Sequence, residues 1–257
     1  MAHRGSRTMW PENTMVAFQQ AVDLGYRYLE TDLHVTADGV LVCFHDDTLE
    51  RITDGTGRLD QRHLADLKTL DAGYRFDPVH HFPHRGEGLT IPTFEELATT
   101  FPDARFTVDL KQGGLEDLLV SAINKHDLWD RVIVGSFRDR RLARFRRISN
   151  GRVATSSGPR ETARLVVGVR LGRGVRLVAD ALQVPTTSRG VRVVDEKVVA
   201  AVHALGKQVH VWTVNERSEM IRLLDIGVDG IITDRPDTLK DLMIERGTGG
   251  PWNGDAA

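Results

Sequence analysis

Short runs of apolar, β-branched residues alternate along the chain with longer segments whose apolar positions recur at helical spacing. The segment MVAFQQAVDLG (15–25) shows the helical pattern, with one apolar face and a glycine at its end, and the segments 196–207 and 219–230 follow the same plan. This alternation predicts parallel strands with helices packed outside them. The apolar runs predicted to be strands are 28–33, 105–110, 131–136, 152–156, 181–185, 208–214 and 230–234.

Seven strands are one short of a TIM-type (β/α)8 barrel, so a further strand must precede the first helix. Only residues 1–3 stand there, and we expect them to form a truncated first strand. The alternation of strands and helices is interrupted over about residues 46–91. We interpret this segment as a small insertion after the second strand, lying over one mouth of the barrel. We expect one domain over residues 1–257, with a flexible tail from about residue 247 to 257.

The overall charge and the cysteine content narrow the class of protein. Lys and Arg total 34 and Asp and Glu total 36, so a net charge of −2 gives no argument for a nucleic-acid partner. No stretch approaches the roughly 20 apolar residues of an integral membrane segment, and no charged-then-apolar leader is present. The single cysteine, Cys43, lies in an apolar run and is predicted to be buried. These features predict a cytoplasmic enzyme, and no feature indicates its oligomeric state.

Acidic residues gather at the ends of two neighbouring predicted strands. Glu30 and Asp32 are two residues apart and therefore point to the same side of their strand, and Asp109 and Lys111 repeat this spacing on the next barrel strand. The carboxyl ends of parallel barrel strands share one mouth, where active sites of this fold are built. Three carboxylates there predict a Ca²⁺ or Mg²⁺ site. The alternative, in which each acid pairs with a nearby Arg or Lys, is equally good for a single acid but weaker for three.

Histidines are the side chains that transfer protons near neutral pH, and two of the ten stand at the ends of predicted strands. His3 ends the first strand and His45 ends the hairpin segment VLVCFH, so both are candidates for proton transfer. His34 is on the side of Glu30 and Asp32, but we predict that it lies past the strand end and bonds at the surface. The other predictions are a barrel histidine at His210, solvated or substrate-facing loop residues at His80, His81 and His84, and surface or half-buried residues on helical stretches at His63, His126 and His203.

Two cations, Arg4 and Lys111, accompany the predicted metal site. Together with a divalent metal they favour a phosphate as the ligand, because its charge is then met on several sides. Trp212 and Asn215 could wall the substrate pocket, and packing at the barrel rim is the alternative for Trp212. The arginine run 137–152 carries an apolar stripe at helical spacing, so most of its arginines are predicted to form a solvated helix face.

Several segments together carry a family resemblance over nearly the whole chain. They are HRG (3–5), PENT (11–14), LETDLHVTADGVLVCFHDDTLERITDGTG (29–57), IPTFEEL (91–97), TVDLK (107–111), VWTVN (211–215) and GVDGIITDRPD (227–237). In these segments and their order the sequence resembles the glycerophosphodiester phosphodiesterases, in particular actinobacterial-like members. The resemblance implies a TIM-type barrel that hydrolyses a small-molecule glycerophosphodiester to glycerol 3-phosphate and an alcohol.

The resemblance also implies roles for individual residues. They are an acid–base pair at His3 and His45, metal ligands at Glu30, Asp32 and Asp109, and phosphate-binding cations at Arg4 and Lys111. The sequence departs from the family pattern at Asp109, where glutamate is common, and in the short apolar run before the HRG segment. The interpretation is therefore a metal-dependent phosphodiesterase with histidine acid–base catalysis.

Two alternatives stay open at this point. One is a phospholipase-D-like hydrolase of lysophospholipids or sphingolipids, which would need an apolar ledge at the barrel mouth. The other is a non-catalytic, phosphate-binding barrel, which the presence of both histidines, all three acids and both cations disfavours. The sequence does not indicate which histidine is the acid and which is the base. It also leaves open whether the attacking oxygen belongs to water or to a hydroxyl of the substrate.

Overall fold

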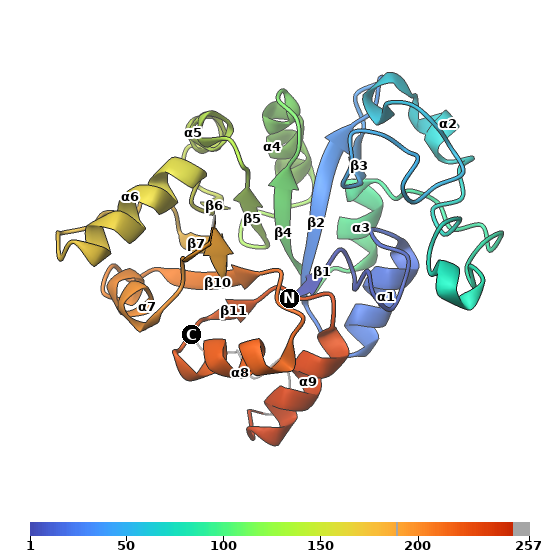
Figure 1. The fold of residues 1–257 in the computed structure, drawn as a ribbon. Coiled ribbons are helices and arrows are strands. Elements are labelled where there is room, and N and C mark those ends of the chain that lie inside the picture. The colour runs from blue at the N-terminus through green and yellow to red at the C-terminus, as the bar shows by residue number, and fades with distance from the viewer. Residues whose placement is uncertain (189, 249–257) are drawn as a thin grey trace.

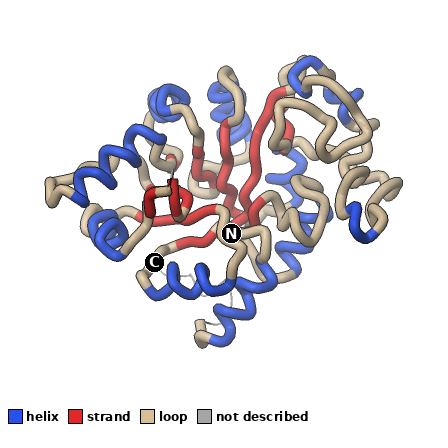
Figure 2. Tube along the Cα trace, viewed as in Figure 1, coloured by secondary structure: helices blue, strands red, loops and turns tan. Residues whose placement is uncertain are grey.

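The computed structural model describes residues 1–188 and 190–248, which form an α/β barrel with strands inside and helices outside (Figure 1; Figure 2). The strands are β1 (Ala2–His3), β2 (Tyr28–Val35), β3 (Leu41–Cys43), β4 (Arg105–Leu110), β5 (Val132–Gly135), β6 (Ala154–Thr155), β7 (Ala181–Pro185), β8 (Thr187–Ser188), β9 (Val191–Arg192), β10 (Gln208–Trp212) and β11 (Gly230–Ile231). The helices are α1 (Met15–Asp23), α2 (Leu64–Leu67), α3 (Phe94–Thr100), α4 (Leu115–Lys125), α5 (Asp139–Ile148), α6 (Pro159–Arg170), α7 (Glu196–His203), α8 (Arg217–Asp225) and α9 (Pro236–Glu245), with short 3-10 helices η1 (Leu59–Gln61) and η2 (Pro78–His80).

The parallel strands close into one barrel. The order β1-β2-β4-β5-β6 continues through a bridge between Ser156 and Ala181 into β7-β10-β11. A second bridge, between Ala2 and Thr233, returns the sheet to β1. Eight strands thus surround the centre, and the predicted (β/α)8 barrel is confirmed, with every predicted strand present.

The first strand is as short as the sequence predicts, yet it is paired on both sides. Ala2 and His3 stand opposite Leu29 and Glu30 of β2, and the His3 amide donates to the Thr233 carbonyl at 2.9 Å. Ala2 is completely buried. Two residues of strand therefore fix the backbone of His3 between the two ends of the barrel sheet.

The insertion predicted over about residues 46–91 contains η1, α2 and η2 and follows β3, which pairs antiparallel with β2 (Figure 1). Its apolar residues Leu49, Leu59, Leu67, Ala72 and Ile91 form, together with Val42 and Phe44 from β3 and just after it, an apolar cluster separate from the main core. Cys43 is buried in the main core, as predicted, and burial raises the pKa of its thiol to about 12. The predicted tail lies outside the described residues from position 249 onward.

Gly5 allows the turn after β1 to lie directly on α1. Its φ is +76°, and a Cβ there would lie 2.7 Å from the backbone carbonyl carbon and the Cβ of Ala17. We expect Gly5→Ala to lower the melting temperature more than Gly39→Ala, since Gly39 has a φ of +82° but open space around it. Both changes carry a backbone cost of about 1–2 kcal/mol, and Gly5→Ala adds an overpacking cost of about 1–3 kcal/mol. Equal melting temperatures for the two variants would show that α1 moves aside without cost.

Candidate active site

Asp32, Asp109 and Lys111 meet at the carboxyl ends of β2 and β4. Asp32 stands directly opposite Asp109 in the parallel register of the two strands. The ammonium of Lys111 lies 2.8 Å from Asp32 Oδ1 and 2.8 Å from Asp109 Oδ2. The period-two spacing and the shared mouth therefore bring these three side chains together as predicted.

Arg4 and Glu30 extend this cluster toward β1. Arg4 Nε lies 3.0 Å from Asp32 Oδ2, and the Arg4 amide donates to Glu30 Oε2 at 3.1 Å. Glu30 is buried beside the negative charge of Asp32, and these two causes raise the pKa of its carboxyl to about 7. The site thus holds one carboxyl group that ionises reluctantly unless further positive charge is present.

His3 lies between two carboxylates. Its Nδ1 is 2.6 Å from Asp234 Oδ1, and its Nε2 is 3.7 Å from Glu30 Oε2. Burial opposes protonation of the ring, but the charges of Glu30 and Asp234 outweigh it and raise the pKa of His3. Asp234 is held in turn by Asn215 Nδ2 at 2.8 Å and by Arg7 Nε at 3.2 Å. Asn215 therefore contacts Asp234, the partner of His3.

His45 is the second histidine of the site. Its Nδ1 lies 2.5 Å from Asp46 Oδ1. Burial lowers the pKa of His45, the nearby cations Lys111 and Arg4 lower it further, and Asp32 and Asp46 oppose them without reversing the direction. Each histidine thus has a carboxylate at Nδ1, although Asp234 and Asp46 were not singled out from the sequence.

His34 corrects a prediction. Strand β2 runs to Val35 because it pairs with β3, so His34 lies within the strand and is buried. Its Nε2 is 3.1 Å from the carbonyl oxygen of His45, and its Nδ1 is 2.9 Å from Gln112 Oε1. The surface location predicted for His34 is wrong, and its ring contacts the backbone of His45.

The carboxylates of the cluster have the chemistry of ligands for a divalent cation. Over residues 1–188 and 190–248, no group of three or more His, Cys, Asp or Glu side chains is already arranged around a common metal position. Asp32 Oδ2 and Asp109 Oδ2 are nevertheless buried, and their ion pairs with Arg4 and Lys111 are not aligned as hydrogen bonds. Together with the raised pKa of Glu30, these oxygens form a donor set that suits a hard cation. The residues therefore fit the predicted metal, which stays a proposal.

Aromatic side chains lie beside Lys111 at the same end of the barrel. Trp212 is half-buried and packs edge-on against Phe137, with ring centroids 5.5 Å apart. The Phe137 ring centroid is 5.8 Å from Lys111 Nζ, and the ring is 58% exposed. Trp212 can therefore contribute to a substrate wall through Phe137, which comes from the arginine-rich segment.

That arginine-rich segment is not only a solvated helix face. Leu142 and Phe145 are buried, as the apolar stripe predicts. Arg141 Nη1, however, donates to the carbonyls of Leu110 and Lys111 at 2.8 and 2.7 Å. Arg141 is an exception to the mostly solvated face predicted for this segment, because its side chain folds back to hold the backbone beneath Lys111.

The other histidines are mostly where the sequence places them. His210 is buried inside the barrel, 3.0 Å from Gln183 Nε2, and burial lowers its pKa to about 4. His80 is exposed and its Nδ1 lies 2.7 Å from Asp77 Oδ2, whereas His84 packs between the rings of Trp10 and Phe76.

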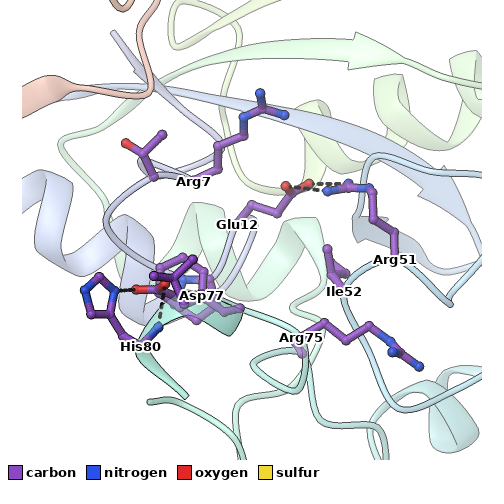
Figure 3. Close-up of a pocket in the computed structure, with 12 residues that line it drawn as sticks. Arg7, Glu12, Arg51, Ile52, Arg75, Asp77 and His80 are labelled. Carbon is purple, nitrogen blue, oxygen red and sulfur yellow. Dashed lines mark hydrogen bonds and ion pairs between the residues drawn. The ribbon is translucent and has the colours of Figure 1, made fainter. Parts of the chain in front are cut away.

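A cavity of about 550 Å³ adjoins the site on the side of the insertion (Figure 3). Three of its lining residues contact the cluster: Arg7 contacts Asp234, Glu12 contacts Arg4, and Arg51 contacts Asp46. The rest of the lining includes Pro11, Ile52, Arg75, Phe76, Val79 and His80. The cavity thus has both charged and apolar walls and lies beside Arg4, Asp46 and Asp234.

Comparisons with known proteins agree on one family. The glycerophosphoryl diester phosphodiesterase family model matches residues 3–238. A probable glycerophosphodiester phosphodiesterase of Mycobacterium tuberculosis is 38% identical over 261 residues, which cover 99% of this chain and 92% of the relative. A glycerophosphodiester phosphodiesterase of Caldanaerobacter subterraneus is 32% identical over 258 residues, which cover 96% of this chain and 98% of the relative.

Solved structures that share this fold are also described as phosphodiesterases. A putative glycerophosphoryl diester phosphodiesterase from Silicibacter pomeroyi has a TM-score of 0.79 at 25% identity, covering 96% of this chain and 92% of that one. A phosphodiesterase from Oleispira antarctica, solved in complex with the product sn-glycerol-3-phosphate, has a TM-score of 0.73 at 26% identity, covering 95% of each chain. In the part of this chain that the structure describes, no helix has the length and apolar character needed to cross a membrane.

Proposed function

Because the chain belongs to the glycerophosphoryl diester phosphodiesterase family, we propose that it hydrolyses glycerophosphodiesters to glycerol 3-phosphate and an alcohol by acid–base catalysis at His3 and His45. Family membership makes the protein a glycerophosphodiester phosphodiesterase, a phosphoric diester hydrolase. The observation that supports His3 and His45 as the acid–base pair is that each ring has a carboxylate at Nδ1. Both rings also adjoin the same acidic cluster. In this proposal His3 and His45 therefore act on the same bound phosphate.

The two cations bind the phosphate in this proposal. Arg4 and Lys111 are buried or half-buried and each contacts Asp32, so their positions are fixed before substrate arrives. Glu30, Asp32 and Asp109 are the residues that would hold Ca²⁺ or Mg²⁺. A divalent cation bound there would neutralise negative charge that gathers on the phosphate oxygens during the reaction.

The histidines move the protons. Since Nδ1 of each ring faces a carboxylate, Nε2 is the nitrogen that remains for the substrate. One ring takes a proton from the attacking oxygen, and the other gives a proton to the leaving alkoxide. The attacking oxygen belongs to water or to the glycerol hydroxyl of the substrate. In the second case a cyclic phosphate forms first and water opens it.

The substrate class follows from the relatives. The Oleispira antarctica phosphodiesterase, solved with sn-glycerol-3-phosphate, supports the same product for this chain. The cavity beside the cluster gives the alcohol portion a place to lie. We propose in addition that residues 1–257 act as one domain in the cytoplasm, with the insertion over the barrel mouth. The contact of Arg51 with Glu12 supports that placement of the insertion.

The test is a product assay with the purified protein. With glycerophosphoethanolamine as substrate, we expect release of ethanolamine and glycerol 3-phosphate in equal amounts, and loss of release when EDTA removes divalent cations. A long-chain lysophospholipid is the comparison substrate for the phospholipase-D-like alternative. Faster release from the lysophospholipid would favour that alternative, and release from neither substrate would favour the non-catalytic barrel.

A further inference from the structure

A continuous series of ion pairs and hydrogen bonds connects Arg4 to His45 through Glu12, Arg51 and Asp46. Glu12 is only 7% exposed, and its carboxylate accepts from Arg4 Nη1 at 3.0 Å. It also accepts from Arg51 Nη1 and Nη2 at 2.8 and 2.6 Å (Figure 3). Arg51 Nε donates to Asp46 Oδ2, and Asp46 Oδ1 lies 2.5 Å from His45 Nδ1. The phosphate-binding arginine and the histidine are therefore joined by direct side-chain contacts.

We infer that Arg51 and Glu12 are positioning residues for the reaction. Arg51 fixes the ring of His45 through Asp46, and Glu12 holds Arg51 and Arg4 in a common frame. The inference rests on the proposed roles of His45 and Arg4 in hydrolysis. It adds a function for the insertion, since Arg51 is the insertion residue whose side chain reaches the catalytic histidine's partner.

The chemistry of arginine explains why this residue suits the position. Its planar guanidinium offers two parallel donors to Glu12 and keeps Nε for Asp46, which a lysine ammonium cannot match. Among the described residues, His45 and Arg51 are the side chains that contact the Asp46 carboxylate. Without Arg51, Asp46 would hold His45 but nothing would hold Asp46.

The charge of Glu12 supports the same role. Burial alone would raise the pKa of its carboxyl, but the hydrogen bonds and charges of Arg51 and Arg4 lower it. Glu12 is therefore ionised at neutral pH and compensates two guanidinium groups. Figure 3 shows the Glu12–Arg51 pair at the wall of the cavity, so a substrate that enters the cavity would lie against this pair.

A double-mutant cycle tests whether Arg51 acts through His45. Arg51→Ala is expected to lower kcat on the order of 10²-fold, as for a catalytic group displaced by about 1 Å, while KM changes much less. In the His45→Ala background the same change should lower kcat by about threefold or less, because the group that Arg51 positions is already absent. Equal losses in the two backgrounds would overturn the inference. Wild-type turnover of His45→Ala alone would instead overturn the proposed role of His45.

Matched variants separate positioning from general stability. Arg58→Ala removes an arginine of the same insertion that pairs with Asp60 but contacts no histidine, and its kcat should stay within about twofold of the wild type. Arg51→Lys should restore only a small part of kcat. Glu12→Gln should raise KM and lower kcat together, because it loosens both Arg4 and Arg51. Melting temperatures are measured for every variant, and a kcat of Arg51→Ala equal to that of Arg58→Ala would overturn the inference.

Discussion

Replacing Glu30 or Asp32 by alanine, one at a time, is expected to abolish phosphodiesterase turnover while the barrel stays folded. Each carboxylate is a proposed ligand of the divalent cation, and Asp32 also holds Arg4 and Lys111. Turnover of glycerophosphoethanolamine is measured with added Ca²⁺ or Mg²⁺ and in excess EDTA. Asp225→Ala is the control, since that exposed acid at the end of α8 pairs with Arg246, and it should keep wild-type turnover. Full turnover of the wild type in excess EDTA would contradict the metal assignment.

Melting temperatures of the Glu30→Ala variant test whether its expected loss of turnover comes from unfolding. The folded-state pKa of Glu30, about 7, lies above the ordinary value of 4.5, so the folded protein binds this proton more tightly than the unfolded chain does. Charging Glu30 therefore destabilises the fold as the pH rises from about 4.5 through 7. In EDTA, Glu30→Ala should melt at or above the wild-type temperature at pH 8 and lose this advantage near pH 4.5. A large fall in melting temperature at pH 8 would contradict this account.

Alanine in place of His3 or His45 is expected to lower kcat on the order of 10²–10⁴-fold, the range usual for loss of a general acid or base. Metal affinity should change little, because neither ring belongs to the proposed metal ligands. Steady-state kinetics give kcat, and calorimetric titration with Ca²⁺ gives the affinity. His203→Ala serves as the control, since that exposed histidine pairs with Asp229 on the outside of the barrel. Near wild-type kcat in either variant would remove that histidine from the acid–base pair.

The residues that could be predicted from the sequence lie on or just after neighbouring strands. Glu30, Asp32, Asp109 and Lys111 follow from two rules, the alternation of side chains along a strand and the common mouth of a parallel barrel. These rules need no knowledge of long-range contacts. They place the cluster correctly because its residues lie on β2 and β4 or directly after them, and the short strand β1 does not affect their spacing.

The supporting residues could not be predicted in this way. Asp234 and His3 are 231 positions apart in the sequence, and Glu12 and Arg51 are 39 positions apart. A local sequence pattern therefore predicts neither contact. Asp234 did carry a signal, because it is the last residue of the last predicted strand (230–234), at the mouth where the other acids gather. His34 was misplaced because the length of β2 depends on its pairing with β3, which periodicity within one segment does not report.

Arg141 illustrates another limit of periodicity. The apolar stripe of α5 correctly gives the buried face of the helix, marked by Leu142 and Phe145. It says nothing about the end of a long arginine side chain, whose apolar stem can follow the helix surface while the guanidinium reaches buried carbonyls. Helix amphipathicity therefore predicted the packing and missed the contact that supports Lys111.

The pairing of His3 with Asp234 joins the two ends of the barrel sheet, and this has a consequence for how the protein is made. His3 is synthesised before strands β2 to β11, whereas its partner Asp234 is synthesised only after almost the entire barrel. The histidine can acquire its orientation only when the last strand closes the sheet against the first. Contacts of such long sequence separation form late and slowly in folding. Chains still in synthesis, however much of the barrel they already contain, therefore have no working catalytic centre.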